Sequence, residues 1–222
     1  MARYGFVVAL IVTLTIPVLA HSDTADKPLT ATPNLLGPTG CIVTPTTEIG
    51  GRSYGAGVHW VADTFTTIAK ASFAPIDQLE IGLSWIDYDD HYSTLNPRIA
   101  FNAKYRICKE GKKTPAVAVG VWDIADQIEI TPYAVISKTF GTQVPVIINL
   151  GGAVGDNIMK GFFANMTIRL LPEVDAMVEW DTAEVNFGMR FRPVKGVTID
   201  LLSIDNGTDR EFGVGGSYMT TF

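Results

Sequence analysis

The 222-residue sequence has little charge, few histidines and no basic cluster. Lys and Arg total 17 against 23 Asp and Glu, which gives a net charge of −6. Basic patches are what nucleic acid requires, so the balance argues against a nucleic-acid partner. The sequence also lacks a glycine-rich phosphate loop, a heptad repeat and any His and Cys spacing typical of zinc sites. It therefore predicts no cofactor and no metal centre.

Cysteine is almost absent: the chain contains only Cys41 and Cys108. An oxidising compartment would permit a disulfide between them. The alternative is that both are unpaired small apolar residues, and we expect this because they lie far apart in the sequence. Neither directly follows an N-terminal apolar run, where a lipid-attachment cysteine would lie.

Long apolar runs are missing after the first 20 residues, which themselves have the pattern of a secretory signal peptide. Arg3 supplies a short positive region, an apolar stretch follows, and Ala20 completes a small-x-small cleavage site before His21. The apolar stretch is about 15 residues long, whereas a spanning helix needs roughly 20. We therefore expect an exported protein without a helical anchor, and such a chain crosses a bilayer only as a closed barrel.

From residue 52 onward the sequence alternates between apolar and polar residues with the period of a β-strand. The clearest runs are 80–86, 98–107, 162–170 and 184–192, each with an unbroken apolar face opposite a face that includes charged residues. A soluble sheet with one wet face gives this pattern. A membrane barrel gives it too, with the apolar face toward lipid and the polar face toward the lumen.

The number and length of these runs favour the barrel. We expect strands near 52–62, 64–74, 79–86, 97–107, 115–122, 129–139, 144–153, 158–170, 174–181, 184–192, 196–204 and 210–222. About twelve is an even number, and most runs are about nine to thirteen residues long, as tilted spanning strands are. Aromatic residues such as Tyr54, Trp60, Tyr133 and Trp180 fall near strand ends, as in interfacial girdles. The sequence thus predicts an all-β fold, an antiparallel transmembrane β-barrel over residues 51–222, preceded by an irregular lead-in or plug over residues 21–50 that is rich in Thr, Pro and Gly.

Residues 210–222, REFGVGGSYMTTF, alternate up to a final aromatic residue. The stretch resembles the C-terminal strand of bacterial outer-membrane barrels, whose terminal Phe is part of the signal read by the assembly machinery. The resemblance implies that Tyr218 and Phe222 form an assembly signal. It also implies a place in the bacterial outer membrane, with lipid and the barrel assembly machinery as partners. The alternative is the edge strand of a soluble sandwich.

A second resemblance covers about residues 36–222. The stretches GPTGCIVTPTTEIGGRSYGAGVHW, ASFAPIDQLEIGLSW, NAKYRI and VEWDTAEVNFGMRFRPVKGVTIDLL look like YjbH-type outer-membrane proteins, which are associated with exopolysaccharide production. The resemblance implies a non-enzymatic barrel that assists export or organisation of surface polysaccharide, with polysaccharide export proteins as further partners. Family members are typically several times longer and often lipoproteins, so the resemblance supports location and fold more than this role.

The alternation also predicts which side chains line the lumen. They are Lys70, Glu80, Arg98, Asn102, Lys104, Arg106, Lys138, Asn165, Arg169, Glu179, Asn186, Arg190, Arg192 and Asp200. We expect Lys70 beside Glu80, Glu80 beside Lys104 and Arg106, and arginines on both sides of the strand that holds Asp175 and Glu179.

Two functions are compatible with this lumen. Paired charges would fill a narrow barrel, with residues 21–50 as a plug, because an unpaired buried charge is costly. Alternatively, excess positive charge would line a water-filled pore for anionic solutes. The filled state is our expectation.

One enzymatic alternative remains in the loop DDHYSTLNP. His91 and Ser93 have the spacing of the His-x-Ser pair of outer-membrane lipid hydrolases, and Asn96 is a possible third member. In those enzymes the pair faces lipid on a strand, whereas here it lies among aspartates in a loop. A solvated external loop is therefore our expectation, and its carboxylates would also suit divalent cations.

Overall fold

The computed structural model describes residues 31–62, 65–88, 98–156, 159–205, 207 and 209–222. These residues form twelve strands in chain order: β1 (Ser53–Val61), β2 (Phe65–Ile76), β3 (Leu79–Tyr88), β4 (Arg98–Cys108), β5 (Ala116–Trp122), β6 (Thr131–Phe140), β7 (Val146–Val154), β8 (Lys160–Leu171), β9 (Val174–Trp180), β10 (Val185–Phe191), β11 (Val197–Asp205) and β12 (Arg210–Thr221). Within the same described ranges, no helix is long and apolar enough to cross a membrane.

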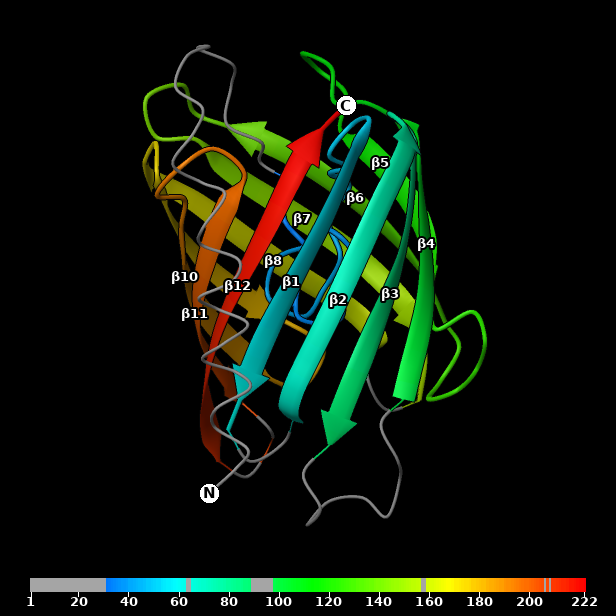
Figure 1. Cartoon of the computed structure of the whole chain (residues 1–222). Helices are drawn as coiled ribbons and strands as arrows, with labels where there is room; N and C mark the ends of the chain where they lie inside the picture. The colour runs from blue at the N-terminus through cyan, green and yellow to red at the C-terminus, as the bar shows by residue number, and fades with distance from the viewer. Residues whose placement is uncertain (1–30, 63–64, 89–97, 157–158, 206, 208) are drawn as a thin grey trace.

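Each strand pairs antiparallel with its sequence neighbour, and β1 pairs with β12, so the sheet closes into a barrel (Figure 1). The closing seam runs in register from Ser53 opposite Thr221 to Val61 opposite Gly213. The predicted antiparallel barrel of about twelve strands is confirmed, and closure leaves no strand edge unpaired in the bilayer.

Period-two alternation sorts the side chains of the barrel into two faces. The outer face is apolar along its length, and its exposed side chains include Ile81, Leu83, Phe101, Leu150, Phe187, Leu201 and Val214. The inner face carries polar and charged side chains that are almost all buried. An apolar band toward lipid and a polar interior are the arrangement of a transmembrane barrel.

Two residues of β6 differ from the sequence prediction. The inward positions of this strand are Thr131, Tyr133, Val135 and Ser137. Tyr133 is therefore inside the barrel and not in an outer girdle. Lys138 lies on the opposite face at the end of the strand, and its ammonium group bonds to the β4–β5 turn, so it does not line the lumen.

The two ends of the barrel are built differently. We call the rim where β1 begins and β12 ends the terminal end; it also holds the turns 77–78, 109–115, 141–145, 172–173 and 192–196. There the Phe222 N–H donates to the Arg52 carbonyl at 3.0 Å. The Phe222 ring stacks on Tyr54 and Phe73 at centroid distances of 6.3 and 5.8 Å. Tyr218 and Phe222, the predicted assembly residues, both lie exposed on the outer face.

Residues 31–50, which we call the lumen segment, lie inside the barrel. Figure 1 shows them as the blue trace enclosed by the strands. All of them except Glu48 and Gly50 are buried, and Leu35, Leu36 and Ile42 pack with inward residues such as Ile68 and Trp122 in one apolar cluster.

Candidate functional site

The lumen segment folds back on itself in short turns. The Asn34 N–H donates to the Pro38 carbonyl and the Leu35 N–H to the Ile42 carbonyl, both at 2.7 Å. Gly37 allows the first turn because its φ is +114°, and a side chain there would collide with Ser84 on β3. These and similar bonds satisfy part of the segment's backbone, and side chains of the wall bind other backbone groups of the segment.

The side chain of Glu179 on β9 binds the backbone of the lumen segment at residues 42–44. Its carboxylate accepts hydrogen bonds from the N–H groups of Ile42, Val43 and Thr44 at 2.9–3.2 Å, and from the Thr44 hydroxyl at 2.6 Å. Glu179 is completely buried, so these donors take the place of water around the charge.

Glu80 on β3 makes a second contact of the same kind. Its carboxylate accepts the Thr39 N–H at 2.7 Å and also the Thr39 hydroxyl. Lys104 on β4 lies 3.7 Å from Glu80 and donates to the Thr39 carbonyl at 2.8 Å. One residue of the segment is thus held by an acid and a base from neighbouring strands.

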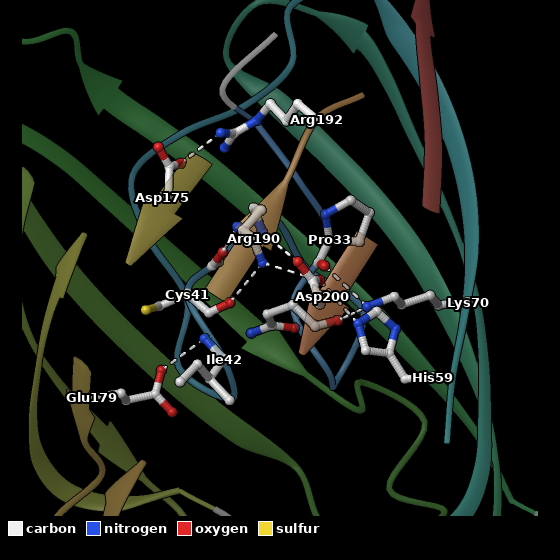
Figure 2. A network of polar contacts seen from close by, with 12 residues as sticks. Pro33, Cys41, Ile42, His59, Lys70, Asp175, Glu179, Arg190, Arg192 and Asp200 are labelled. Carbon is white, nitrogen blue, oxygen red and sulfur yellow. Dashed lines mark hydrogen bonds and ion pairs between the residues drawn. The ribbon is translucent and has the colours of Figure 1, made fainter. Parts of the chain in front are cut away.

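Cationic and aromatic donors of the wall bind the segment's carbonyl groups. Lys70 donates to Pro33 at 3.0 Å and to Asn34, and the Trp122 indole donates to Leu36 at 3.1 Å. In a further pair of bonds, the Arg190 guanidinium donates to the carbonyls of Gly40 at 3.2 Å and Cys41 at 2.9 Å (Figure 2). The wall therefore recognises the segment mainly through its main chain.

A separate set of ion pairs joins wall residues to one another. Asp200 on β11 lies 2.8 Å from Arg190 Nε and 3.0 Å from His59 Nε2. Asp175 on β9 lies 2.7 Å from Arg192 and 3.1 Å from Arg169. Figure 2 shows Asp200 between Arg190 and His59, and the Arg192–Asp175 pair above them.

A line of uncharged groups completes the contact on the β6–β8 side. Ser137 donates to Asn149, Asn149 donates to Asn165 at 2.6 Å, and Asn165 donates to the Thr44 hydroxyl at 2.8 Å. The Ser137 hydroxyl also accepts the Thr47 N–H at 3.2 Å.

Most of the predicted lumen residues do face inward. Lys70, Glu80, Asn102, Lys104, Asn165, Glu179, Asn186, Arg190, Arg192 and Asp200 are buried there, and Arg98, Arg106 and Arg169 lie on the same face near the rims, partly exposed. Lys138 is the exception described above.

Some predicted neighbours differ. Glu80 and Lys104 are opposite each other, but Lys70 is opposite Ser84 and not Glu80. Arg106 instead donates to the Asp77 carbonyl at the terminal end. The turn at 77–78 pairs Ile76 with Leu79, so Glu80 lies near the end of β2, and Lys70 falls four residues farther along β3, opposite Ser84.

Several residues of the contact were not predicted. Trp122 was expected only as part of a strand, and Ser84, Ser137 and Asn149 are ordinary polar residues. Strand parity places each of them inward, so alternation alone was a usable signal. Nothing in the sequence marks which main-chain group each one binds.

Both cysteines are free thiols, Cys41 buried in the segment and Cys108 exposed at the end of β4. Burial raises the pKa of the Cys41 thiol well above its ordinary value. Where the structure describes the chain, no group of His, Cys, Asp or Glu is arranged to hold a metal ion. His91, Ser93, Asn96 and the signal region 1–20 lie outside the described residues.

A cavity of about 310 Å³ opens at the terminal end. Its wall combines the start of the lumen segment, Ala31 to Pro33, with the turns 172–173 and 192–196 and with Ser217 and Met219 of β12. A second space near Arg169 and Glu48 is only about 20 Å³, enough for a water molecule.

Comparison with known proteins agrees with this geometry. A model of the YjbH family, described as exopolysaccharide biosynthesis protein YbjH, matches residues 32–198. No curated protein matches the chain. Among solved structures, the KdgM porin aligns with a TM-score of 0.51 at 11% identity, over 75% of this chain and 98% of that one. The NanC porin aligns at 0.52 and 10% identity, over 74% and 98%. At such identities the likeness is one of fold, and the fold is that of outer-membrane porins.

Proposed function

Because the chain belongs to the YjbH family of exopolysaccharide biosynthesis proteins, we propose that it is a non-enzymatic outer-membrane barrel that assists export or organisation of surface polysaccharide. In this proposal the barrel is closed at rest by the lumen segment. Polysaccharide export proteins and outer-membrane lipid are its proposed partners, and the exposed Tyr218 and Phe222 are its proposed signal to the barrel assembly machinery.

The observation that carries the proposal is the way the segment is held. Glu179, Glu80 and Arg190 bind its main-chain groups, so most of its hydrogen bonds to the wall do not depend on which side chains it carries. Apolar packing of Leu35, Leu36 and Ile42 stabilises the filling, whereas buried ion pairs and polar networks add little net stability. Water can replace hydrogen bonds to a main chain. This supports a lumen segment that is released from the barrel while the wall keeps its own ion pairs.

A small pore for anionic solutes is the second candidate. Release of the segment would uncover Lys70, Lys104 and Arg190, whose ammonium and guanidinium groups now bind its carbonyls. The fold likeness to the KdgM porin, which has a structure in complex with disordered oligogalacturonate, fits this candidate.

Two measurements test the proposal. In the first, cells lacking the gene are compared with the parent for secreted and surface-bound polysaccharide, with a plasmid copy as control. The proposal expects less polymer, or polymer that is no longer retained, and an unchanged amount in both fractions contradicts it.

The second measurement is single-channel conductance of the refolded protein. The intact chain is expected to be silent, and a variant lacking residues 31–50, verified as folded by its resistance to unfolding in detergent, is expected to conduct. Steady conductance from the intact chain would favour the open anion pore instead.

A further inference from the structure

The cavity at the terminal end has the composition of a carbohydrate site. Its lining includes the hydroxyls of Thr32, Thr198 and Ser217, the rings of Pro33 and Pro172, and the guanidinium of Arg192. Hydroxyls and a planar cation beside small apolar surfaces are the groups that contact a pyranose ring, which has polar edges and apolar faces. The volume of about 310 Å³ is at the lower end of small-molecule sites.

Arg192 gives the cavity its charge preference. One guanidinium nitrogen pairs with Asp175 at 2.7 Å, and the side chain is only 7% exposed. Its Nε has no hydrogen-bond partner among the residues that the structure describes. Because this donor is buried, it meets a ligand in the cavity when the side chain turns toward it, and arginine binds carboxylates through two parallel N–H groups.

The other lining groups are compatible with an acidic sugar. Thr32, Thr198 and Ser217 all line the cavity, and a hydroxyl can both donate to and accept from sugar hydroxyls. Glu173 also lines the cavity, and its carboxylate can accept a hydrogen bond from a sugar hydroxyl. Lys195 adds a second positive charge to the lining.

We propose that this cavity binds one carboxylate-bearing sugar unit of an acidic polysaccharide, with the carboxylate on Arg192. The choice of polymer rests on the proposed role in polysaccharide handling. Because Thr32 and Pro33 belong to the lumen segment, a bound sugar touches both the wall and the segment, and Pro33 is also the residue whose carbonyl accepts Lys70.

The test compares two ligands that differ only at one carbon, methyl β-D-glucuronide and methyl β-D-glucoside. Binding to the full mature protein in detergent micelles is followed by saturation-transfer difference NMR. The glucuronide is expected to bind at least about 10-fold more tightly, as one charge-assisted contact implies. Equal binding of the two, or no binding of the glucuronide to folded protein, overturns the proposal.

Variants locate the site. Arg192→Gln is expected to weaken glucuronide binding by about 10- to 100-fold, with Asp175 still paired to Arg169. Thr198→Val removes one hydroxyl without changing the volume and is expected to weaken binding by a few-fold. Thr131→Val removes a buried inward hydroxyl at the opposite end and is the matched control. Losses that are the same in Thr198→Val and Thr131→Val overturn the assignment.

This result is separate from the test of the proposed function. If the protein does not bind the sugar, the site is refuted, but a loss of polysaccharide in cells lacking the gene would still support the proposed function. An unaltered phenotype together with selective glucuronide binding would instead refute the export role and retain the site.

Discussion

Two pairs of buried carboxylates on the lumen wall have different partners. Glu80 and Glu179 accept hydrogen bonds from the lumen segment, whereas Asp175 and Asp200 accept them from arginines of the wall itself. Glutamate carries one more methylene group than aspartate, and here the longer side chain extends to the segment while the shorter one bonds to side chains of other wall strands.

The difference separates contacts within the barrel wall from contacts between the wall and the lumen segment. The aspartate pairs join residues of β8 to β11 to one another without involving the segment. The glutamate contacts exist only when the segment is present. Arg190 belongs to both sets, because it bonds to Asp200 and to the carbonyls of Gly40 and Cys41.

The largest effect is expected from breaking the wall set. Asp200→Asn leaves Arg190 as a buried cation without its carboxylate, and loss of one partner of a buried pair typically costs about 3–5 kcal/mol. We expect the free energy of unfolding of the whole barrel to fall by this order. Denaturant titration followed by the gel mobility of folded and unfolded barrel measures it. A change within about 0.5 kcal/mol, the size expected at an unimportant surface site, would show that the wall does not depend on this pair.

The next largest effect is expected from breaking the segment set. Glu179→Gln keeps the size of the side chain but turns an acceptor oxygen into a donor facing N–H groups. Hydrogen bonds to charged groups contribute about 1.5–3 kcal/mol each, so loss of one or two should raise the population of released segment by about 10- to 100-fold or more.

Cys41 reports that release. In a Cys108→Ser background, maleimide labelling of Cys41 should accelerate by the same factor in Glu179→Gln. The barrel itself should unfold at nearly the same denaturant concentration as the parent. Glu173→Gln, an exposed acid in the neighbouring turn, is the control. Labelling that stays slow in Glu179→Gln would mean that Glu179 does not hold the segment.

A smaller effect is expected from pH, because burial raises the pKa of the Cys41 thiol above that of the unfolded chain. The folded state keeps this proton where the unfolded state has lost it, so stability is full below about pH 8.5 and falls above it. The slope for one proton is about 1.4 kcal/mol per pH unit. Cys41→Ala should remove this part of the decline between pH 8.5 and 10. Parallel curves for parent and variant would disprove it.

The smallest effect is expected outside both sets. Lys138→Met breaks the pair with Glu110, 3.0 Å apart and partly exposed on the rim, and such pairs are worth about 0–1 kcal/mol. The unfolding free energy should change by less than this, and so should the labelling rate of Cys41. A large loss would place Lys138 back among the structural charges of the lumen.

The strands were predictable from the sequence to within about two residues, because alternation is local and each strand shows it independently. Parity also placed thirteen of the predicted lumen residues on the inner face. It was wrong at Lys138 because β6 has polar residues on both faces near the rim, so that Ser137 and Lys138 compete for the inward position.

The contacts of the lumen segment were not predictable in the same way. The segment has no period, and its partners are main-chain groups whose positions depend on turns such as the one at Gly37. The register between β2 and β3 likewise decided that Lys70 lies opposite Ser84, and a bulge of this kind leaves no clear signal in the sequence.

The closing seam has a consequence for how the protein is made. Eleven of the twelve strand pairs join sequence neighbours, whereas β1 and β12 are separated by the rest of the barrel. The lumen segment runs directly into β1, so it enters the barrel from the strand that forms one side of that seam. If β1 and β12 pair last, as their sequence separation favours, the other strands pair around the segment while the sheet is still open. The segment would then act as a template for the curvature of the sheet, and its turns would form before the hydrogen bonds between β1 and β12.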